Sequence, residues 1–303
     1  MKKDVWFLEG TNMAQLYVRR YDDESILQKK GIVQILHGMG DYGDRYDDFA
    51  YFLAQHGYVI YIHDHRKHGK SISGEQKVGY FDTDRWSEMV ADIDCVQQDI
   101  LKRESATRVI MIGHSMGSFL LRNYLIDYGK NVSKAVIIGT ASTDVLLSKI
   151  GIFLGKVIEA VAPNKPSKFL DTMSVGKYAK VFTPKRTGLE WLTRDESIVD
   201  FYVASPLCGY VYTPRFYTEV AKGLIDIVKE ERVKKTPKIP LYFIAGDKDP
   251  VGNQGTGVEK VFAMYTKLGY DTRVKLYPNA RHEILNELNK DEVFADILTF
   301  IEG

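Results

Sequence analysis

The chain has 303 residues, which is enough for one large domain or two small ones to bury a full core. Apolar residues make up 45% of it and charged residues 27%, as is typical of globular proteins. The formal net charge of +1 gives no electrostatic reason to expect nucleic acid or an anionic membrane as a main partner.

The cysteines and the amino-terminal segment bear on the compartment. Cys95 and Cys208 are far apart and have no metal-ligand spacing, which predicts reduced, packed thiols in a cytoplasmic protein. Residues 1–20 contain no continuous apolar segment, and no run in the chain approaches the roughly 18 apolar residues of a membrane span. We therefore expect no signal peptide and no stable membrane insertion. The sequence leaves the oligomeric state open.

Short apolar segments alternate with helical periodicity over both ends of the chain. In chain order we expect a strand at 31–38, a helix at 44–57, a strand at 58–64, a helix at 84–104, a strand at 108–112, a helix at 116–128, a strand at 134–140 and, after a gap, a strand at 240–246, a helix at 254–268, a strand at 271–277 and a helix at 282–302. This alternation predicts an α/β protein with a mostly parallel central sheet flanked by helices on both faces.

The segment 141–212 interrupts that alternation. It opens with the helix-period apolar stretch "DVLLSKIGIFLGKVIEAVAP" and continues through turn-rich sequence. An insertion at this point lies where ligands bind in open α/β sheets. We therefore expect a helical cap over a core formed by 1–140 and 213–303. The alternative is an insertion that only packs structurally.

The stretch "IGHSMGS" at 112–118 follows an apolar strand and precedes a helix. In a G-x-S-x-G elbow the chain turns sharply at the serine, and the flanking positions need residues without a bulky side chain. Gly113 and Gly117 meet that need and leave Ser115 exposed at the edge of the sheet. The alternative is an ordinary glycine-rich loop, so the rest of the chain must decide.

A serine nucleophile needs a base, and the base needs an acid to hold it. In hydrolases with this elbow the chain order is serine, acid, histidine. Of the seven histidines only His282 follows Ser115, and it lies in a short loop after a predicted strand. Asp249 follows the preceding strand and is held by Pro250, which makes it the predicted acid, with Asp247 as the alternative.

The tetrahedral intermediate of such a reaction needs two N–H donors for its oxyanion. The elbow predicts one donor at Met116, the residue after the nucleophile. The second is expected in the loop "HGMGDYG" at 37–43, where two glycines free the backbone of Met39 to present its N–H. These independent features agree in order and position, so the sequence predicts a catalytic serine.

Five motifs together resemble the α/β-hydrolases of the monoacylglycerol lipase and lysophospholipase group. They are "HGMGDYGDRY" (37–46), "DHRKHGKS" (64–71), "GHSMGS" (113–118), "GDKDPVG" (246–252) and "ARHEILNE" (280–287). The resemblance implies an α/β-hydrolase fold with a cap, and a serine esterase or lipase that needs no cofactor. By position it implies a triad of Ser115, Asp249 and His282, with Met39 and Met116 at the oxyanion.

Two positions depart from that pattern. Lys67 stands where the family usually has glycine, and Ser205 stands where an aspartate is common. Neither position belongs to the triad. They therefore affect the expected local geometry but not the expected reaction.

Three alternative functions remain to be weighed. The H-x-H-x-x-H pattern at 63–68 resembles part of a dinuclear zinc motif, but Lys67 occupies the place of the expected aspartate, so we expect no metal site. An aminopeptidase would need carboxylates near the site, for which Asp195, Glu196 and Asp200 are the candidates. A non-catalytic ligand-binding protein of the same fold is disfavoured by the complete triad.

The apolar stripe of the predicted cap helix suggests the substrate. Its members, at helical spacing, are Leu146, Ile150, Phe153, Leu154, Val157, Ile158 and Val161. If part of this stripe faces Ser115, it lines an acyl channel, for which Ile150, Phe153 and Leu154 are the predicted binding residues. The expected substrate is therefore a small-molecule ester or lipid with a medium or longer acyl chain, such as a monoglyceride or lysophospholipid.

Overall fold

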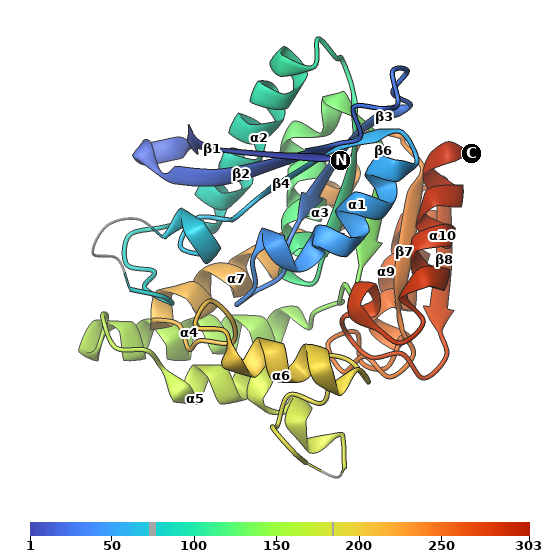
Figure 1. Ribbon diagram of the computed structural model, residues 1–303. Coiled ribbons are helices and arrows are strands. Elements are labelled where there is room, and N and C mark those ends of the chain that lie inside the picture. The colour runs from blue at the N-terminus through green and yellow to red at the C-terminus, as the bar shows by residue number, and fades with distance from the viewer. Residues whose placement is uncertain (73–76, 184) are drawn as a thin grey trace.

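A computed structural model describes residues 1–72, 77–183 and 185–303 (Figure 1). Within these residues the strands form one eight-stranded sheet in the order β1-β2-β4-β3-β5-β6-β7-β8. The strands are β1 (Lys2–Glu9), β2 (Gln15–Asp22), β3 (Gly31–Leu36), β4 (Tyr58–His63), β5 (Val109–His114), β6 (Val132–Ile138), β7 (Leu241–Gly246) and β8 (Thr272–Tyr277). From β4 to β8 every neighbouring pair is parallel, which confirms the predicted mostly parallel sheet.

Helices cover both faces of the sheet. The α-helices are α1 (Asp47–Gln55), α2 (Trp86–Arg103), α3 (Met116–Tyr128), α4 (Val145–Val161), α5 (Lys168–Asp171), α6 (Glu196–Ala204), α7 (Pro214–Asp226), α8 (Glu230–Val233), α9 (Thr256–Lys267) and α10 (Lys290–Glu302). Helices α1 and α10 pack on one face, and α2, α3, α7 and α9 pack on the other, as two separate hydrophobic clusters show. Central strands such as β4, β5 and β7 are buried along their whole length because both faces are covered.

The amino-terminal hairpin and the last helix differ from the sequence-based expectation. Strands β1 and β2 form an antiparallel hairpin that extends the sheet beyond β4, and the sequence analysis predicted no strand there. The helix expected at 282–302 begins only at Lys290. The chain before it is a loop with a short 3-10 turn at Ile284–Asn286, because its backbone groups bond to other segments.

The segment between β6 and α7 forms a helical layer at the carboxyl ends of the parallel strands, with α4, α5 and α6 along the bottom of the view in Figure 1. Helix α4 packs closely on α7 through Gly155, where an added Cβ would lie 2.3 Å from Thr218 Cγ2. Residues 73–76 of the predicted core and residue 184 of the predicted cap lie outside the described residues. Among the described helices, none combines the length and apolar content that crossing a bilayer requires.

Candidate active site

Ser115 lies on a strained turn between β5 and α3. Its φ of 54° and ψ of −121° are rare for a residue with a side chain, and such strain persists only where the surroundings enforce it. The two glycines of the elbow are required by close packing. A Cβ on Gly113 would lie 2.5 Å from the Gly117 carbonyl oxygen, and one on Gly117 would lie 2.2 Å from that of Leu36. The predicted elbow is therefore present.

Two hydrogen bonds connect the three residues predicted as a triad. The hydroxyl oxygen of Ser115 is 2.8 Å from His282 Nε2, and His282 Nδ1 is 2.9 Å from Asp249 Oδ2. The other oxygen of this fully buried carboxylate accepts a hydrogen bond from Val251 N at 2.8 Å. Asp247, the alternative acid, instead accepts from Asn279 N near the surface and does not reach the histidine.

The loop that carries His282 is held by a segment of the chain that the sequence analysis did not single out. The backbone N–H groups of His282 and Glu283 donate to the carbonyl oxygens of Trp191 and Leu192, at 3.2 and 2.6 Å. The indole of Trp191 also lies over the imidazole, with ring centroids 5.2 Å apart. A contact between residues about 90 positions apart leaves no local sequence signal.

The backbone around Met39 is fixed in a defined orientation. His37 Nδ1 donates to the Gly38 carbonyl at 2.8 Å, and His37 Nε2 accepts from His65 N at 2.9 Å. Because the Gly38 carbonyl and the Met39 N–H belong to one planar peptide, holding the carbonyl turns that N–H to the opposite side. In the described part of the chain neither Met39 N nor Met116 N has a hydrogen-bond acceptor, so both predicted oxyanion donors are available.

Both backbone groups of Gly40, the next residue of this loop, are held by the segment that follows α6. Gly40 N donates to the Tyr212 hydroxyl at 2.8 Å, and the Gly40 carbonyl accepts from Gly209 N at 3.0 Å. The Tyr212 hydroxyl lies 2.7 Å from Nε2 of His68, whose Nδ1 bonds the Arg66 carbonyl at 2.9 Å. His68 Nδ1 therefore carries its proton, and Tyr212 donates to Nε2 while accepting from Gly40.

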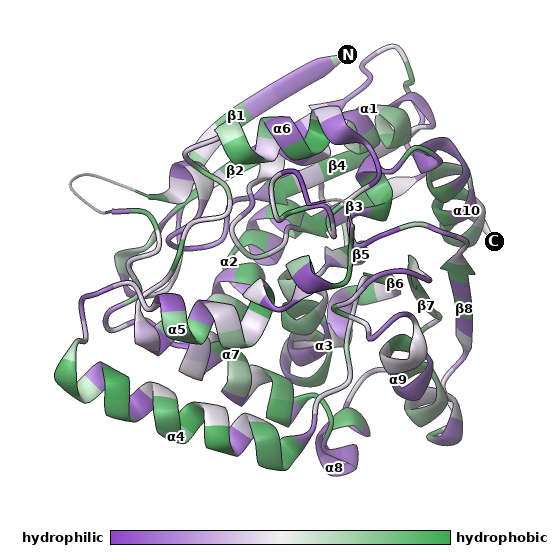
Figure 2. Cartoon of the chain, turned by 90° about the horizontal axis from the view of Figure 1, so that it is seen from below, coloured by the Kyte–Doolittle hydropathy of each residue, from purple (hydrophilic) through white to green (hydrophobic). Residues whose placement is uncertain are grey.

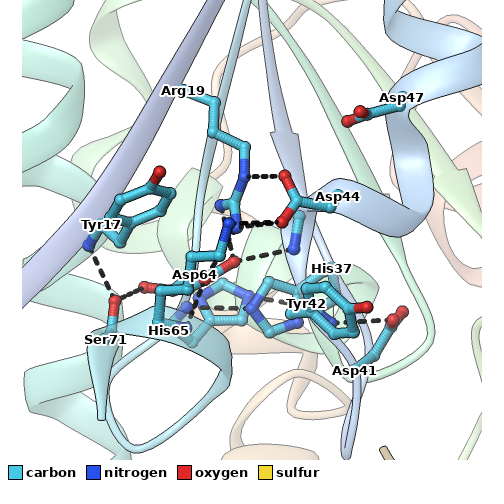
Figure 3. A network of polar contacts seen from close by, with 12 residues as sticks. Tyr17, Arg19, His37, Asp41, Tyr42, Asp44, Asp47, Asp64, His65 and Ser71 are labelled. Carbon is cyan, nitrogen blue, oxygen red and sulfur yellow. Dashed lines mark hydrogen bonds and ion pairs between the residues drawn. The ribbon is translucent and has the colours of Figure 1, made fainter. Parts of the chain in front are cut away.

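A buried ion-pair network supports the same loop from the sheet side (Figure 3). The guanidinium of Arg19 donates to both carboxylate oxygens of Asp64, at 2.7 and 3.0 Å, and to Asp44 at 2.6 Å. Asp64 also accepts from Gly43 N at 2.7 Å, which ties the end of the loop to this pair. Removing one partner of a buried pair is costly because it leaves an uncompensated charge. Arg19 belongs to the unpredicted hairpin, so no sequence pattern indicated this role.

A second polar cluster lies beside the elbow. The Tyr46 hydroxyl bonds Asp41 Oδ2 and His114 Nδ1, each at 2.9 Å, and Arg45 bonds both Asp41 and Glu283. Burial lowers the pKa of His114 to about 4, which keeps this histidine uncharged near neutral pH. The cluster therefore adds fixed hydrogen bonds next to Ser115, and His114 is not a second base.

A cavity of about 830 Å³ reaches Ser115 and His282 and is lined largely by apolar side chains. Those from the helical layer and α7 include Leu147, Ile150, Leu170, Met173, Val181, Phe216, Val220 and Leu224. Ile150 lies in this lining as predicted, but Phe153 and Leu154 do not. Helix α4 contacts α7 at Gly155, and this contact sets the rotation of α4 about its axis. In that orientation Leu147 and Ile150 line the cavity, whereas Phe153 is 65% exposed.

Of the three histidines of the zinc-like pattern, His65 and His68 have other partners, and both ring nitrogens of His63 are buried without one among the described residues. His65 Nε2 contacts the His37 carbonyl, and His68 uses both ring nitrogens as described above. Across residues 1–72, 77–183 and 185–303, no three His, Cys, Asp or Glu side chains are grouped as a metal site would require. Lys67 adopts a left-handed φ of 60°, which explains why glycine suits this position. The other departure, Ser205, accepts a hydrogen bond from Leu207 N at 3.3 Å.

A mostly parallel sheet with a serine elbow after β5, an aspartate after β7 and a histidine after β8 defines an α/β-hydrolase fold. The chain belongs to the family described as serine aminopeptidase, S33, whose profile matches residues 28–289. The predicted fold and hydrolase class are therefore confirmed.

Relatives and solved structures extend this comparison. A monoacylglycerol lipase of Mycolicibacterium smegmatis is 27% identical over 276 residues, covering 90% of this chain and 88% of the relative. A probable lysophospholipase L2 of Haemophilus influenzae is 22% identical over 298 residues, covering 96% and 88%. The crystal structure of a thermostable carboxyl esterase from Bacillus coagulans superposes with a TM-score of 0.91 at 28% identity, covering 100% of this chain and 99% of that one. Proteins with these names are carboxylic ester hydrolases.

Proposed function

We propose that this protein hydrolyses carboxylic esters of lipid type, such as monoacylglycerols or lysophospholipids, through an acyl-enzyme on Ser115. The observation that carries the proposal is the hydrogen-bonded series Ser115, His282, Asp249 at the base of a largely apolar cavity. The names of the relatives agree with this substrate class.

The geometry supports a two-step acyl transfer. His282 Nε2, 2.8 Å from the Ser115 hydroxyl, takes its proton while the oxygen attacks the ester carbonyl carbon. The N–H groups of Met39 and Met116 stabilise the negative charge that forms on the carbonyl oxygen. His282 then gives the proton to the leaving alcohol, and the same histidine activates the water that releases the acid.

Asp249 acts through the histidine. Its Oδ2 accepts the Nδ1–H of His282 at 2.9 Å, which keeps Nε2 free to accept the serine proton and stabilises the imidazolium that follows. The second oxygen is occupied by Val251 N, so the carboxylate cannot rotate away without losing a buried hydrogen bond.

The cavity favours an acyl chain over a peptide. Each buried methylene contributes roughly 0.8 kcal/mol, or about fourfold in kcat/KM, so a few methylenes change the rate by tens to hundreds of fold. The acids expected of an aminopeptidase do not face the cavity: Asp195 caps α6, Glu196 is exposed, and Asp200 pairs with Arg186. Among the acids that do line it, Asp41 and Glu283 are bound by Arg45, and Asp144 caps α4 by accepting from Leu147 N.

We also propose that residues 141–212 act as the cap of a core formed by 1–140 and 213–303. Two observations support this division. Residues of α4 line the cavity, and the cap segment around Trp191 holds the histidine loop. On this basis the cap has two tasks, to shape the acyl site and to position the base.

Labelling by a fluorophosphonate and hydrolysis of an ester series from acetyl to tetradecanoyl test the proposal. Wild type should label quickly and prefer longer chains, and Ser115→Ala should keep its fold but lose turnover by several orders of magnitude. Wild-type-like turnover in a folded Ser115→Ala protein would remove the mechanism, and faster cleavage of aminoacyl amides than of esters would favour the peptidase.

A further inference from the structure

One edge of the central sheet is formed by a long and regular strand. In the sheet order β1 stands at one end, and Figure 2 shows it along the upper margin of the molecule. It runs for eight residues, Lys2–Glu9, without proline and without a shift in its register against β2. The edge of such a strand is a template on which another strand can pair.

The backbone groups of β1 that point away from the sheet belong to its odd-numbered residues. Gly10 N donates to the Ala14 carbonyl at 2.7 Å, so in this antiparallel register the even-numbered residues of β1 exchange hydrogen bonds with β2. On the far side of β2, Asp64 N donates to the Tyr17 carbonyl at 2.9 Å, which agrees with this alternation. The residues that present N–H and carbonyl groups outward are therefore Lys3, Val5, Phe7 and Glu9. Among the described residues these backbone groups have no hydrogen-bond partner.

The side chains of the same four residues lie on one face of the sheet, because side chains alternate along a strand. Val5 and Phe7 are large and apolar, yet they are 49% and 55% exposed. Glu9 is exposed, and in the described chain no cation lies within ion-pair distance of it. Lys3 is held at 2.8 Å by acids of the loop that leads into α1 and of α1 itself. This face therefore reads cation, apolar, apolar, anion along the strand.

We propose that β1 pairs with β1 of a second copy of the chain, antiparallel and with two-fold symmetry centred on Trp6. The outward backbone groups then meet as hydrogen-bonded pairs, with Val5 opposite Phe7 of the partner and Lys3 opposite Glu9 of the partner, each pair occurring twice. Apolar side chains cover one another and opposite charges meet, and cross-strand pairs of both kinds stabilise a sheet. The two eight-stranded sheets become one continuous sheet.

The neighbouring register and the other edge of the sheet fit less well. A two-fold axis centred on Val5 would leave Lys3 opposite the apolar Phe7 of the partner. At the other edge, β8 carries Arg273 and Lys275 two residues apart. Centring an antiparallel pair of β8 strands on Val274 would place Arg273 opposite Lys275, and centring it on Lys275 would place that lysine opposite its own copy. Like charges directly opposite each other destabilise a pair of strands.

Sedimentation velocity of the full chain measures the association directly. We expect a monomer–dimer equilibrium between about 1 μM and about 1 mM protein. The melting temperature should rise with protein concentration, because only the folded chain can pair in this way. A wild-type protein that stays monomeric over the whole range would overturn the proposal.

Two kinds of variant locate the interface. Phe7→Pro removes one outward N–H and none of the hydrogen bonds to β2, and Val5→Lys with Phe7→Lys places like charges opposite each other twice. Each should raise the Kd of the dimer by at least about tenfold. The matched control, Leu27→Lys with Val274→Lys, adds the same charge at two exposed apolar positions outside β1, one of them on the other edge of the sheet, and should leave the Kd nearly unchanged.

An exchange of charge tests the pairing itself. Val5→Glu with Phe7→Glu should also dissociate the homodimer, but an equimolar mixture with the lysine variant should form heterodimers, because each lysine then lies opposite a glutamate. Thermal melting and acetyl-ester turnover show that each variant keeps its fold, since Val5 and Phe7 lie outside the cavity lining. A dimer that the β1 variants leave intact or that the control dissociates, or a mixture that stays monomeric, would overturn the proposal.

Discussion

Replacing Asp249 by asparagine tests the assignment of the acid most sharply, because the two residues have nearly the same shape. In the structure both carboxylate oxygens act as acceptors, one from His282 Nδ1 at 2.9 Å and one from Val251 N at 2.8 Å. Asparagine offers one acceptor oxygen and one NH₂ group. The two contacts therefore cannot both be kept as they are.

Of the two amide orientations, the one of lower free energy is the one that stops the reaction. If the amide oxygen stays with Val251 N, the NH₂ group faces His282, which moves its proton from Nδ1 to Nε2, and both the Val251 N–H and the His282 ring stay hydrogen-bonded. If the amide flips, the Val251 N–H is buried against a donor, at a cost of about 1–3 kcal/mol. In the favoured arrangement Nε2 is protonated and cannot accept the proton of Ser115.

We expect kcat/KM of Asp249→Asn to fall by about 10⁴-fold, equivalent to about 5.5 kcal/mol of transition-state stabilisation. The assay is hydrolysis of a butyryl ester, with thermal melting to show that the variant is folded. Asp247→Asn is the matched control, because Asp247 accepts from Asn279 N at 2.7 Å and Lys248 Nζ at 3.5 Å near the surface and does not contact His282. A loss below about tenfold in folded Asp249→Asn, or an equal loss in Asp247→Asn, would refute this reasoning.

Three further predictions follow from other parts of the site and core. Tyr212→Phe removes the acceptor of the Gly40 N–H, so kcat should fall roughly tenfold with KM nearly unchanged, and a change in KM alone would contradict a role in positioning the oxyanion loop. Burial lowers the pKa of His63 to about 3, so as the pH falls the unfolded state binds a proton at this histidine before the folded state does. The free energy of unfolding should therefore fall below about pH 6.5, by about 1.4 kcal/mol per pH unit for this residue. Urea titrations between pH 5 and pH 8 give the free energy of unfolding at each pH, and its slope against pH should be shallower for His63→Leu by about one proton. An unchanged slope would exclude His63 as a source of the pH dependence. Ile150→Asp should reduce the preference for long acyl chains more than it reduces acetyl-ester turnover, whereas Phe153→Asp should not, because only Ile150 lines the cavity; equal effects would contradict that placement.

The parts of the site that could be predicted from the sequence are those marked by a short local pattern or by the order of residues along the chain. The elbow is a five-residue pattern whose glycines are required because a Cβ added at Gly117 would lie only 2.2 Å from the Leu36 carbonyl oxygen. Asp249 and His282 could be located because each follows a recognisable strand and because chain order leaves one histidine after Ser115. The core strands were predictable because full burial on both faces requires continuous apolar runs.

The parts that could not be predicted depend on pairs of distant residues. Trp191 and Leu192 hold the His282 loop through their carbonyl oxygens, which every residue type possesses, so no side-chain pattern marks them. The clamp of Gly40 by Tyr212 joins residues 172 positions apart. The amino-terminal hairpin has mixed polar and apolar composition because it forms the edge of the sheet, where one strand is half exposed.

Helix α4 shows how an averaged or one-sided pattern can mislead. A broad apolar stripe normally faces the core, since burial of apolar surface drives packing. Here α4 meets α7 at Gly155, where an added Cβ would lie 2.3 Å from Thr218 Cγ2. This glycine is the only buried residue of the helix, and larger apolar side chains such as Phe153 and Val161 remain exposed. The net charge of +1 is an average of the same kind, because it does not reveal that residues 145–181 contain six lysines and only two acids. An apolar stripe at helical spacing therefore predicts a helix, but the packing of its neighbours decides which side of that helix is buried.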